Sequence, residues 1–199
     1  MKQVLIETQL FKPSKGLLSE GKMSERGNPL VEGILATCEV ENGNGRYYSK
    51  DLWEREIDKY MELVQDNRAT GELDHPESQV INLKNVSHNI KDINWDGKNI
   101  MGTIELLPTP SGNILKALID SGITVGVSSR GMGSLEQKGD LMEVQDDFEL
   151  LCWDFVSTPS NPGSFMTLKE GKENNINQYA KANSIVTEIL CANGNCPIF

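Results

Sequence analysis

The spacing of apolar residues changes along the chain and predicts where strands and helices lie. Residues 31–40, VEGILATCEV, are typical of a strand, and the Gly- and Asn-rich residues 41–46 are typical of a turn. A helix is expected next, with Ser49 as its N-cap, because the following apolar residues recur at helical spacing. We expect these residues to belong to the core: Leu52, Trp53, Ile57, Tyr60, Met61 and Val64.

Strand-like sequence dominates from residue 80 onward. Residues 80–107 predict strands with a hairpin at the Asp96-Gly97 step. Residues 111–120 predict a short second helix that ends at Gly122. Its inward residues are expected to be Ile114, Leu115, Leu118 and Ile119. With further strand-like runs up to residue 156, the pattern predicts an α+β fold that is rich in β-structure and has one core.

Both ends of the chain lack this regular pattern. Residues 11–30 mix Pro, Gly, Ser and charged residues, and the composition shifts again after Gly163 towards an Asn-rich segment. We therefore divide the chain into a flexible leader (1–30), one folded domain (31–165) and a mobile C-terminal tail (166–199).

Composition and charge narrow the function classes. The 199 residues include 19 basic and 29 acidic ones, a net charge of −10, which argues against a protein whose main task is binding duplex DNA. No apolar run reaches the length of about 18 residues that a membrane span needs, and the first residues lack the features of a signal peptide. We expect a soluble intracellular protein without a membrane or direct nucleic-acid partner.

The four cysteines do not indicate a metal site. Cys38 and Cys152 lie in strand-like runs, where small buried hydrophobes are expected. Cys191 and Cys196 could pair or hold half a metal site, but no second Cys/His pair has the spacing that zinc requires. We expect neither a metal nor a cofactor.

The two histidines, His75 and His88, are the candidates for a histidine-dependent mechanism. His75 lies in GELDHP (71–76), a loop of the kind that holds catalytic groups at strand ends. Taken alone, it is better explained as a turn histidine with a solvated ring. His88 alternates with apolar residues on a predicted strand, which favours a structural role.

The segment GVSSRGMG (126–133) is a second candidate site. A serine between an apolar strand and a Gly-rich turn has an accessible hydroxyl, and the turn would direct backbone N–H groups to one point, as an oxyanion hole requires. Arg130 adds a positive charge there. A simple anion-binding nest or a Gly-rich hairpin would explain the same residues.

Asp154 is the third candidate. It shares the predicted face of its strand with apolar residues, and a carboxylate in such a place needs a partner, for which an imidazole is suitable. A strand-end aspartate that faces solvent is an equal alternative. A serine, a histidine and an aspartate together would supply a nucleophile, a base and an orienting carboxylate.

In this order, the motifs resemble the prohead (capsid maturation) proteases of large contractile-tailed phages. The resemblance covers about residues 31–165 and rests on NGNGRYYSKDLWE, GELDHP, VSHNI, WDG, TPSGNILKALIDSGITVGVSSRGMG and DFVSTPSNPGS. Its most specific part is GELDHP followed by GVSSRGMG. The family is similar in fold to the herpesvirus assemblins, which implies a barrel-like domain flanked by helices.

The resemblance also implies roles for residues. His75 matches the catalytic histidine, and Ser129 is the implied nucleophile because the related proteases have Ser-x-Gly here, which Ser129-Arg130-Gly131 fits. Asp154 is the implied third member. Assemblins use a second histidine instead, so His88 is kept as the alternative. Arg130 and Gly131 are expected to support the oxyanion.

The implied function is that of a serine endopeptidase. It would cut scaffold/core proteins, the major capsid protein and itself inside the prohead, in the infected bacterial cytoplasm. The expected cleavage position is after Glu in Leu/Ile-x-Glu, and the first self-cleavage is expected after Glu20 and Glu170. A homo-oligomer is compatible with this function. The alternative is a non-enzymatic structural protein of the virion with a related β-barrel. A phosphate-binding module at 128–133 ranks last because the Lys and the strand–loop–helix frame of a phosphate loop are missing.

Overall fold

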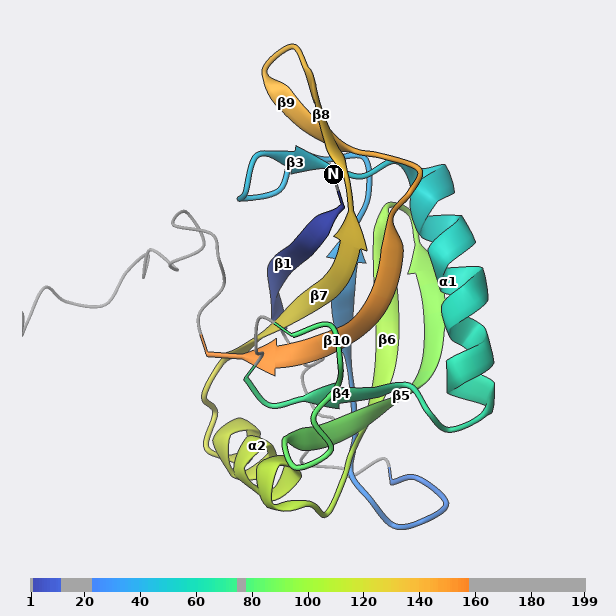
Figure 1. Ribbon diagram of the computed structural model, residues 1–199. Coiled ribbons are helices and arrows are strands. Elements are labelled where there is room, and N and C mark those ends of the chain that lie inside the picture. Colours follow the sequence, from blue (N-terminus) through green and yellow to red (C-terminus); the bar gives the residue numbers. More distant parts are fainter. Residues whose placement is uncertain (1, 12–22, 75–77, 158–199) are drawn as a thin grey trace, which may run out of the picture. The chain divides into compact units, whose positions relative to one another are not determined.

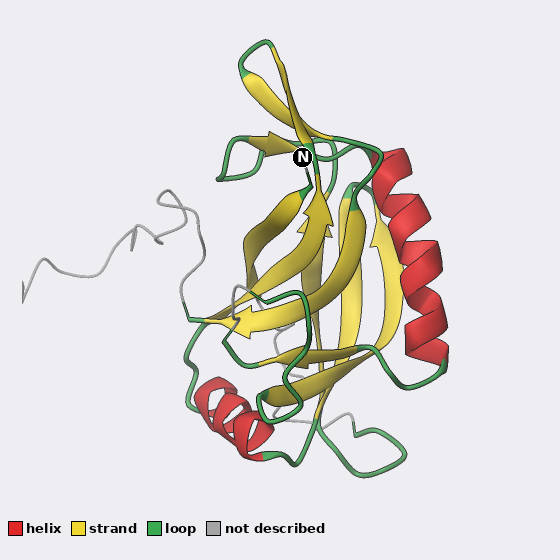
Figure 2. Cartoon of the chain, viewed as in Figure 1, coloured by secondary structure: helices red, strands yellow, loops and turns green. Residues whose placement is uncertain are grey.

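The computed structural model describes residues 2–11, 23–74 and 78–157 (Figure 1). Its elements, in chain order, are β1 (Gln3–Phe11), β2 (Leu30–Thr37), β3 (Arg46–Tyr47), α1 (Lys50–Gln65), β4 (Thr70–Glu72), β5 (Val86–Asp96), β6 (Asn99–Leu106), α2 (Pro110–Asp120), β7 (Val125–Gly133), β8 (Leu135–Lys138), β9 (Leu141–Val144) and β10 (Glu149–Val156). Two helices with several mostly antiparallel sheets confirm the α+β class for the described ranges (Figure 2).

Two larger sheets form the body of the described residues. One has the strand order β1-β7-β10 and the other β2-β6-β5-β4, while β3, β9 and β8 form a small third sheet. The two larger sheets meet where β4 ends. Leu73 bridges Phe155 in parallel, and the Asp74 N–H donates to the Phe155 carbonyl at 2.7 Å. The end of β4 is therefore fixed beside β10, with β7 next to it.

Helix α1 follows the sequence pattern. Ser49 is its N-cap and accepts a hydrogen bond from the Leu52 N–H, as predicted. Of the six predicted core residues, Met61 is only partly buried and the other five are buried. Trp53 packs against Trp153 with ring centroids 6.1 Å apart, so the helix closes the core over β10.

One charged residue lies on the buried face of α1, which the apolar pattern did not indicate. Glu56 is 3% exposed and accepts the Leu150 N–H at 3.0 Å. Leu150 stands at the irregularity between Leu150 and Cys152 in the pairing of β10 with β7. The Glu56 carboxylate serves there as the acceptor, because a bulge leaves a backbone N–H without its ladder partner.

The β5–β6 hairpin and α2 confirm the predictions for residues 80–120, except that β5 begins only at Val86 and that one residue of α2 faces outward. Gly97 has a φ of 62° in the hairpin turn, and Gly122 has a φ of 74° just after α2. Leu115 and Ile119 are buried, but Ile114 is 55% exposed, so its inward placement is wrong. A helix of this length presents only a narrow stripe to one sheet, and Ile114 lies outside it.

Three further expectations need correction or fall outside the described ranges. The prediction of a flexible leader is wrong for residues 3–11, because β1 pairs with β7 along its whole length and Leu5 is fully buried. The loop expected at 71–76 begins inside the strand β4, which ends at Glu72. The tail (166–199) with Cys191 and Cys196 lies outside the described residues.

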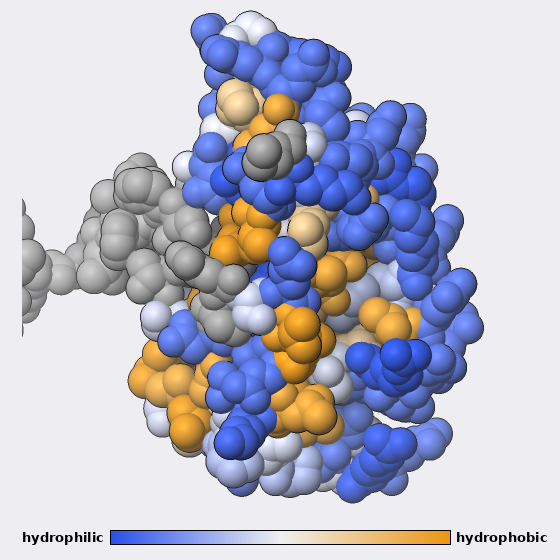
Figure 3. All heavy atoms as spheres, viewed as in Figure 1, coloured by the Kyte–Doolittle hydropathy of each residue, from blue (hydrophilic) through white to orange (hydrophobic). Residues whose placement is uncertain are grey.

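Cys38 and Cys152 are buried free thiols, as expected. No described helix has the length and apolar character needed to cross a membrane. The surface visible in Figure 3 is mainly hydrophilic, in line with the acidic composition, and carries separate hydrophobic patches.

Candidate active site

The segment that carries the two candidate serines is a strand. Val125–Gly133 forms β7, which pairs with β1 on one side and with β10 on the other, so the expected Gly-rich turn is wrong. The backbone N–H groups of a strand that is paired on both sides are used by the two ladders. A nest of converging N–H groups at Arg130 and Gly131 is therefore not formed in this strand, and their oxyanion role stays a prediction.

Strand geometry separates the two serines. Ser129 pairs with Glu7 and Trp153, whereas Ser128 pairs with Thr8 and Asp154. Successive side chains of a strand point to opposite faces, and directly paired residues share a face. Ser128 and Asp154 are thus on one face of the sheet, and Ser129 is on the other.

The face of Ser129 is the core face. Val127 and Trp153 share this face and are buried in the hydrophobic core. Ser129 itself is 2% exposed. The structure therefore does not bring Ser129 and Asp154 together, in contrast to what the sequence-based assignment requires.

The face of Ser128 is polar although it is buried. Ser128 is fully buried, and its hydroxyl has no hydrogen-bond partner in the described part of the chain. Leaving a buried hydroxyl unpaired costs about 1–3 kcal/mol. Such a group in a native fold calls for an explanation, and catalysis is one.

Arg130 lies at the centre of this face with its guanidinium completely buried. Its Nε is 3.0 Å from Asp154 Oδ2, and its Nη2 is 3.2 Å from Glu72 Oε1. The Nε and Nη2 groups also approach the Cys152 sulfur at 3.3 and 3.1 Å. Burial, followed by the charge of Asp154, raises the pKa of the Cys152 thiol far above its usual range, so Cys152 stays protonated. The cluster therefore holds one cation and two carboxylates.

Glu72 is the functional candidate that the sequence analysis did not single out. Besides Arg130, it accepts the Asn82 N–H at 2.8 Å and the Asn85 side-chain amide at 3.3 Å. Arg130 itself donates to the Ser78 carbonyl at 2.7 Å. The cluster thus fixes the described residues that follow GELDHP onto β7 and β10. The signal in the sequence was Glu72 itself, a carboxylate immediately before Leu73-Asp74-His75.

His75 lies outside the described residues. The residue before it, Asp74, has a φ of 62°, a left-handed conformation that turns the chain. Its N–H is bound to Phe155, next to Asp154 on β10.

His88 is buried, and both of its ring nitrogens are used. Its Nε2 is 3.1 Å from the Trp153 carbonyl, which can only accept, so Nε2 carries the proton. The Ser87 hydroxyl, 2.8 Å away, then donates to Nδ1. Burial lowers the pKa of His88 to about 4, so the ring is neutral at neutral pH. This environment favours the structural role over that of a third catalytic member.

Gly131 is required by packing and not by a positive φ. A Cβ there would overlap the Phe148 ring and come within 2.8 Å of the Glu149 carbonyl oxygen. Among the described residues, no group of three or more His, Cys, Asp or Glu side chains is arranged to hold a metal ion.

Comparisons with known proteins agree on one family. A family model described as "Prohead core protein serine protease" matches residues 7–176. The prohead core protein protease of Enterobacteria phage T4 is 34% identical over 145 residues, covering 70% of this chain and 68% of that protein. The solved structure of the bacteriophage T4 capsid assembly protease is similar with a TM-score of 0.69 and 29% sequence identity, over 79% of this chain and 99% of that one.

These matches decide between the two hypotheses from the sequence, because a prohead protease is a peptidase and not a structural subunit. The resemblance seen in the sequence motifs is confirmed, and so is the fold shared with a solved capsid protease. The chain belongs to the family of prohead core protein serine proteases, the capsid maturation proteases of contractile-tailed phages.

Proposed function

We propose that this chain is a serine endopeptidase that cuts scaffold/core proteins and the major capsid protein inside the immature capsid, in the cytoplasm of the infected bacterium. The names of its relatives, a prohead core protein protease and a capsid assembly protease, support these substrates and this location. The observation that carries the catalytic part is the buried hydroxyl of Ser128, which is paired with Asp154 across the strands and has no hydrogen-bond partner among the described residues.

Ser128 is the nucleophile in this proposal, in place of the Ser129 that the motif suggested. A nucleophilic hydroxyl must be free to give its proton to a base and must not be committed to another acceptor. Within the described ranges Ser128 meets this condition and faces the polar cluster, whereas Ser129 faces the hydrophobic core.

His75 is the proposed general base, and Asp154 is its proposed orienting carboxylate. Support comes from Asp74, which precedes His75 and is bound to Phe155, the neighbour of Asp154. Asp154 also forms the ion pair with Arg130, so its carboxylate has to be shared between the two tasks. A carboxylate has about four lone-pair sites and is able to serve both.

The experiment compares Ser128→Ala with the matched control Ser129→Ala. Cleavage of a purified scaffold protein of the same phage is followed by gel electrophoresis. Ser128→Ala should lose at least about a thousandfold in rate, as expected for a serine nucleophile, while the control stays within about tenfold of the wild type. An inactive Ser129→Ala enzyme beside an active Ser128→Ala enzyme would return the role to Ser129.

We further propose that the enzyme cuts after Glu in Leu/Ile-x-Glu and processes itself after Glu20 and Glu170. The other Glu residues in matching triplets lie in regular elements, whose backbone is already hydrogen-bonded and is not free to enter the active site of a protease: Glu7 in β1, Glu32 in β2, Glu54 in α1 and Glu143 in β9. Glu20 and Glu170 lie outside the described residues.

Mass spectrometry of the chain incubated alone tests self-cleavage. Fragments that begin at Gly21 or end at Glu170 should form with the wild type and be absent with Ser128→Ala. The same fragments in both samples would indicate a contaminating protease, and their absence from both would refute the proposal.

A further inference from the structure

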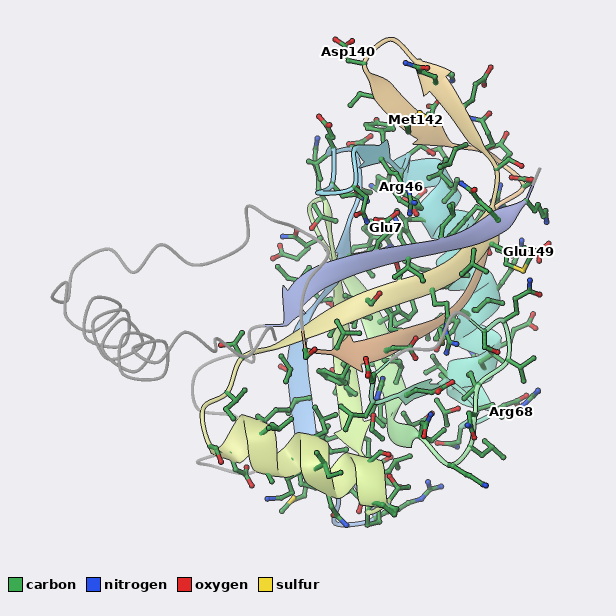
Figure 4. The ribbon with its side chains drawn as sticks, turned by 60° about the vertical axis from the view of Figure 1, so that its left-hand side comes forward. Glu7, Arg46, Arg68, Asp140, Met142 and Glu149 are labelled. Atoms are coloured by element: carbon green, nitrogen blue, oxygen red, sulfur yellow. The ribbon has the colours of Figure 1, made fainter. Side chains whose placement is uncertain are left out.

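Strand β10, which begins at the labelled Glu149 in Figure 4, contains a bulge close to its start. Leu150 pairs with Gly131 of β7. The neighbouring residue of β7, Arg130, pairs with Cys152, so β10 has one extra residue at this point. Bulges change the direction of the side chains that follow them and are common next to active sites.

The bulge decides on which face of the sheet Asp154 lies. With the bulge, Asp154 pairs with Ser128 and shares its polar face. If the pairing at Leu150 continued regularly along β10, Asp154 would instead lie opposite Val127, which belongs to the hydrophobic core. A shift by one residue reverses the faces of all the following side chains. The bulge thus keeps the Asp154 carboxylate on the face of Ser128 and within reach of Arg130.

Helix α1 holds the bulge with two neighbouring side chains. Glu56 Oε2 accepts the backbone N–H of Leu150 at 3.0 Å. Arg55 Nη2 donates to the Phe148 carbonyl at 3.2 Å, so the helix contacts the chain on both sides of Glu149. A backbone N–H that a bulge removes from the ladder needs another acceptor, because an unpaired buried N–H costs free energy. Glu56 supplies this acceptor from a helix that is distant in the sequence.

Glu56 is itself held in place. It is buried, and its Oε1 accepts from Lys59 Nζ at 2.8 Å and from Arg55 Nε at 3.0 Å. Burial alone would raise the pKa of Glu56, but the hydrogen bonds from Lys59, the Leu150 N–H and Arg55 lower it below its usual value. Glu56 is therefore ionised at neutral pH, and an ionised carboxylate is a strong acceptor for a backbone N–H.

We propose that Glu56 is a positioning residue for the peptidase reaction, because by holding the β10 bulge it sets the register that directs Asp154 to the catalytic base. The inference rests on the proposed function of Asp154 as the orienting carboxylate. Trp153 also packs against α1, through Trp53 and Tyr60. If this aromatic packing alone set the register, loss of the Glu56 acceptor would leave the reaction unchanged.

The first test measures kcat and KM for cleavage of a purified scaffold protein of the same phage. Glu56→Met keeps the length of the side chain but cannot accept the Leu150 N–H. It should lower kcat about a hundredfold with KM within about twofold, because a displacement of about 1 Å at a reacting group has an effect of this size. Glu56→Gln, which keeps one acceptor oxygen, should be at least about tenfold more active than Glu56→Met. The matched control is Glu54→Met, which replaces an exposed glutamate of the same helix and should stay within about twofold of the wild type.

A double variant shows whether Glu56 acts through Asp154. Adding Glu56→Met to Asp154→Asn should change kcat by less than about threefold, because the carboxylate that Glu56 positions is already absent. An undiminished hundredfold loss in this background would overturn the proposal. Equal kcat values for Glu56→Met and Glu54→Met would overturn it as well.

The register is also measured without activity, in the Ser128→Ala chain. Nuclear Overhauser contacts between the backbones of Trp153 and Ser129 report the bulged pairing. Glu56→Met should weaken these contacts and increase the hydrogen exchange of the Leu150 N–H at least about tenfold, whereas Glu54→Met should change neither. An unchanged register beside a strongly impaired Asp154→Asn enzyme would refute this inference alone, while nearly normal activity of Asp154→Asn would refute the proposed function. Circular dichroism verifies the fold, and Glu56→Asp, whose carboxylate is shorter by one methylene, replaces Glu56→Met if the latter does not fold.

Discussion

The two carboxylates beside Arg130 allow the roles of ion-pair partner and catalytic group to be separated. Asp154→Asn and Glu72→Gln are matched changes, because each keeps the side-chain shape and removes one negative charge. Both residues are fully buried, and they lie 3.0 and 3.2 Å from the guanidinium. Asp154 also accepts the backbone N–H of Glu72, and Glu72 accepts the backbone N–H of Asn82. The amide oxygen of the Asn or Gln side chain can still accept these hydrogen bonds.

The structure gives the expected size of the two effects. Removing a partner from a buried ion pair costs about 3–5 kcal/mol when it leaves a charge uncompensated. Here one carboxylate always remains beside Arg130, so the loss should be smaller. Glu72→Gln removes one charge-assisted interaction with Arg130 and Asp154→Asn removes two, each worth about 1.5–3 kcal/mol. We therefore expect Asp154→Asn to lose more free energy of unfolding than Glu72→Gln. Arg130→Met, which leaves two carboxylates without their cation, should lose more than either.

Activity should separate the two variants. If Asp154 orients the base, Asp154→Asn lowers kcat by a factor on the order of 10⁴ with little change in KM, as in known catalytic triads. Glu72→Gln should lower kcat by a factor of about ten, because it acts only through the position of residues 78–85. Urea unfolding in the Ser128→Ala background measures stability, and scaffold cleavage measures kcat and KM. Equal losses of kcat in the two variants would refute the catalytic role of Asp154.

Two further predictions concern stability. The pKa of His88 is lowered to about 4 in the folded chain, so the unfolded chain binds more protons between about pH 6.5 and pH 4. The contribution of His88 to the free energy of unfolding is therefore complete above pH 6.5 and falls by about 3 kcal/mol towards pH 4. Urea unfolding of His88→Gln should lack this part of the pH dependence, and an unchanged slope would show that another group is responsible. Gly131→Ala should destabilise the fold by about 1–3 kcal/mol or more, because the added Cβ overlaps Phe148. In the control Gly133→Ala the atoms nearest to the added Cβ are 3.2 Å away, so the loss of stability should be smaller. Equal melting temperatures of the two alanine variants would contradict the packing argument.

Local signals in the sequence determined several elements. The N-cap Ser49, the apolar stripe of α1 and the hairpin at Asp96-Gly97 depend on residues that are close in the chain, so their spacing is sufficient to predict them. The motifs GELDHP and GVSSRGMG also indicated the family, and with it the kind of reaction. The sequence thus identified the region of the site and its chemical groups.

Pairing with distant segments decided the rest. β1 contains nine residues that look like part of a leader, and they form a strand because β7 supplies an edge and the core takes up Leu5. The same pairing converts the expected turn around Ser128 into a strand. Glu56 lies on an apolar helix face because β10 presents an N–H to it.

The choice between Ser128 and Ser129 shows most clearly where sequence information ends. Neighbouring strand residues point to opposite faces, so a shift by one position moves a hydroxyl from the polar cluster to the core. The motif contains both serines and does not say which face is covered by α1 and which by residues 78–85. Only the register of β7 against β10, which pairs Ser128 with Asp154, distinguishes them.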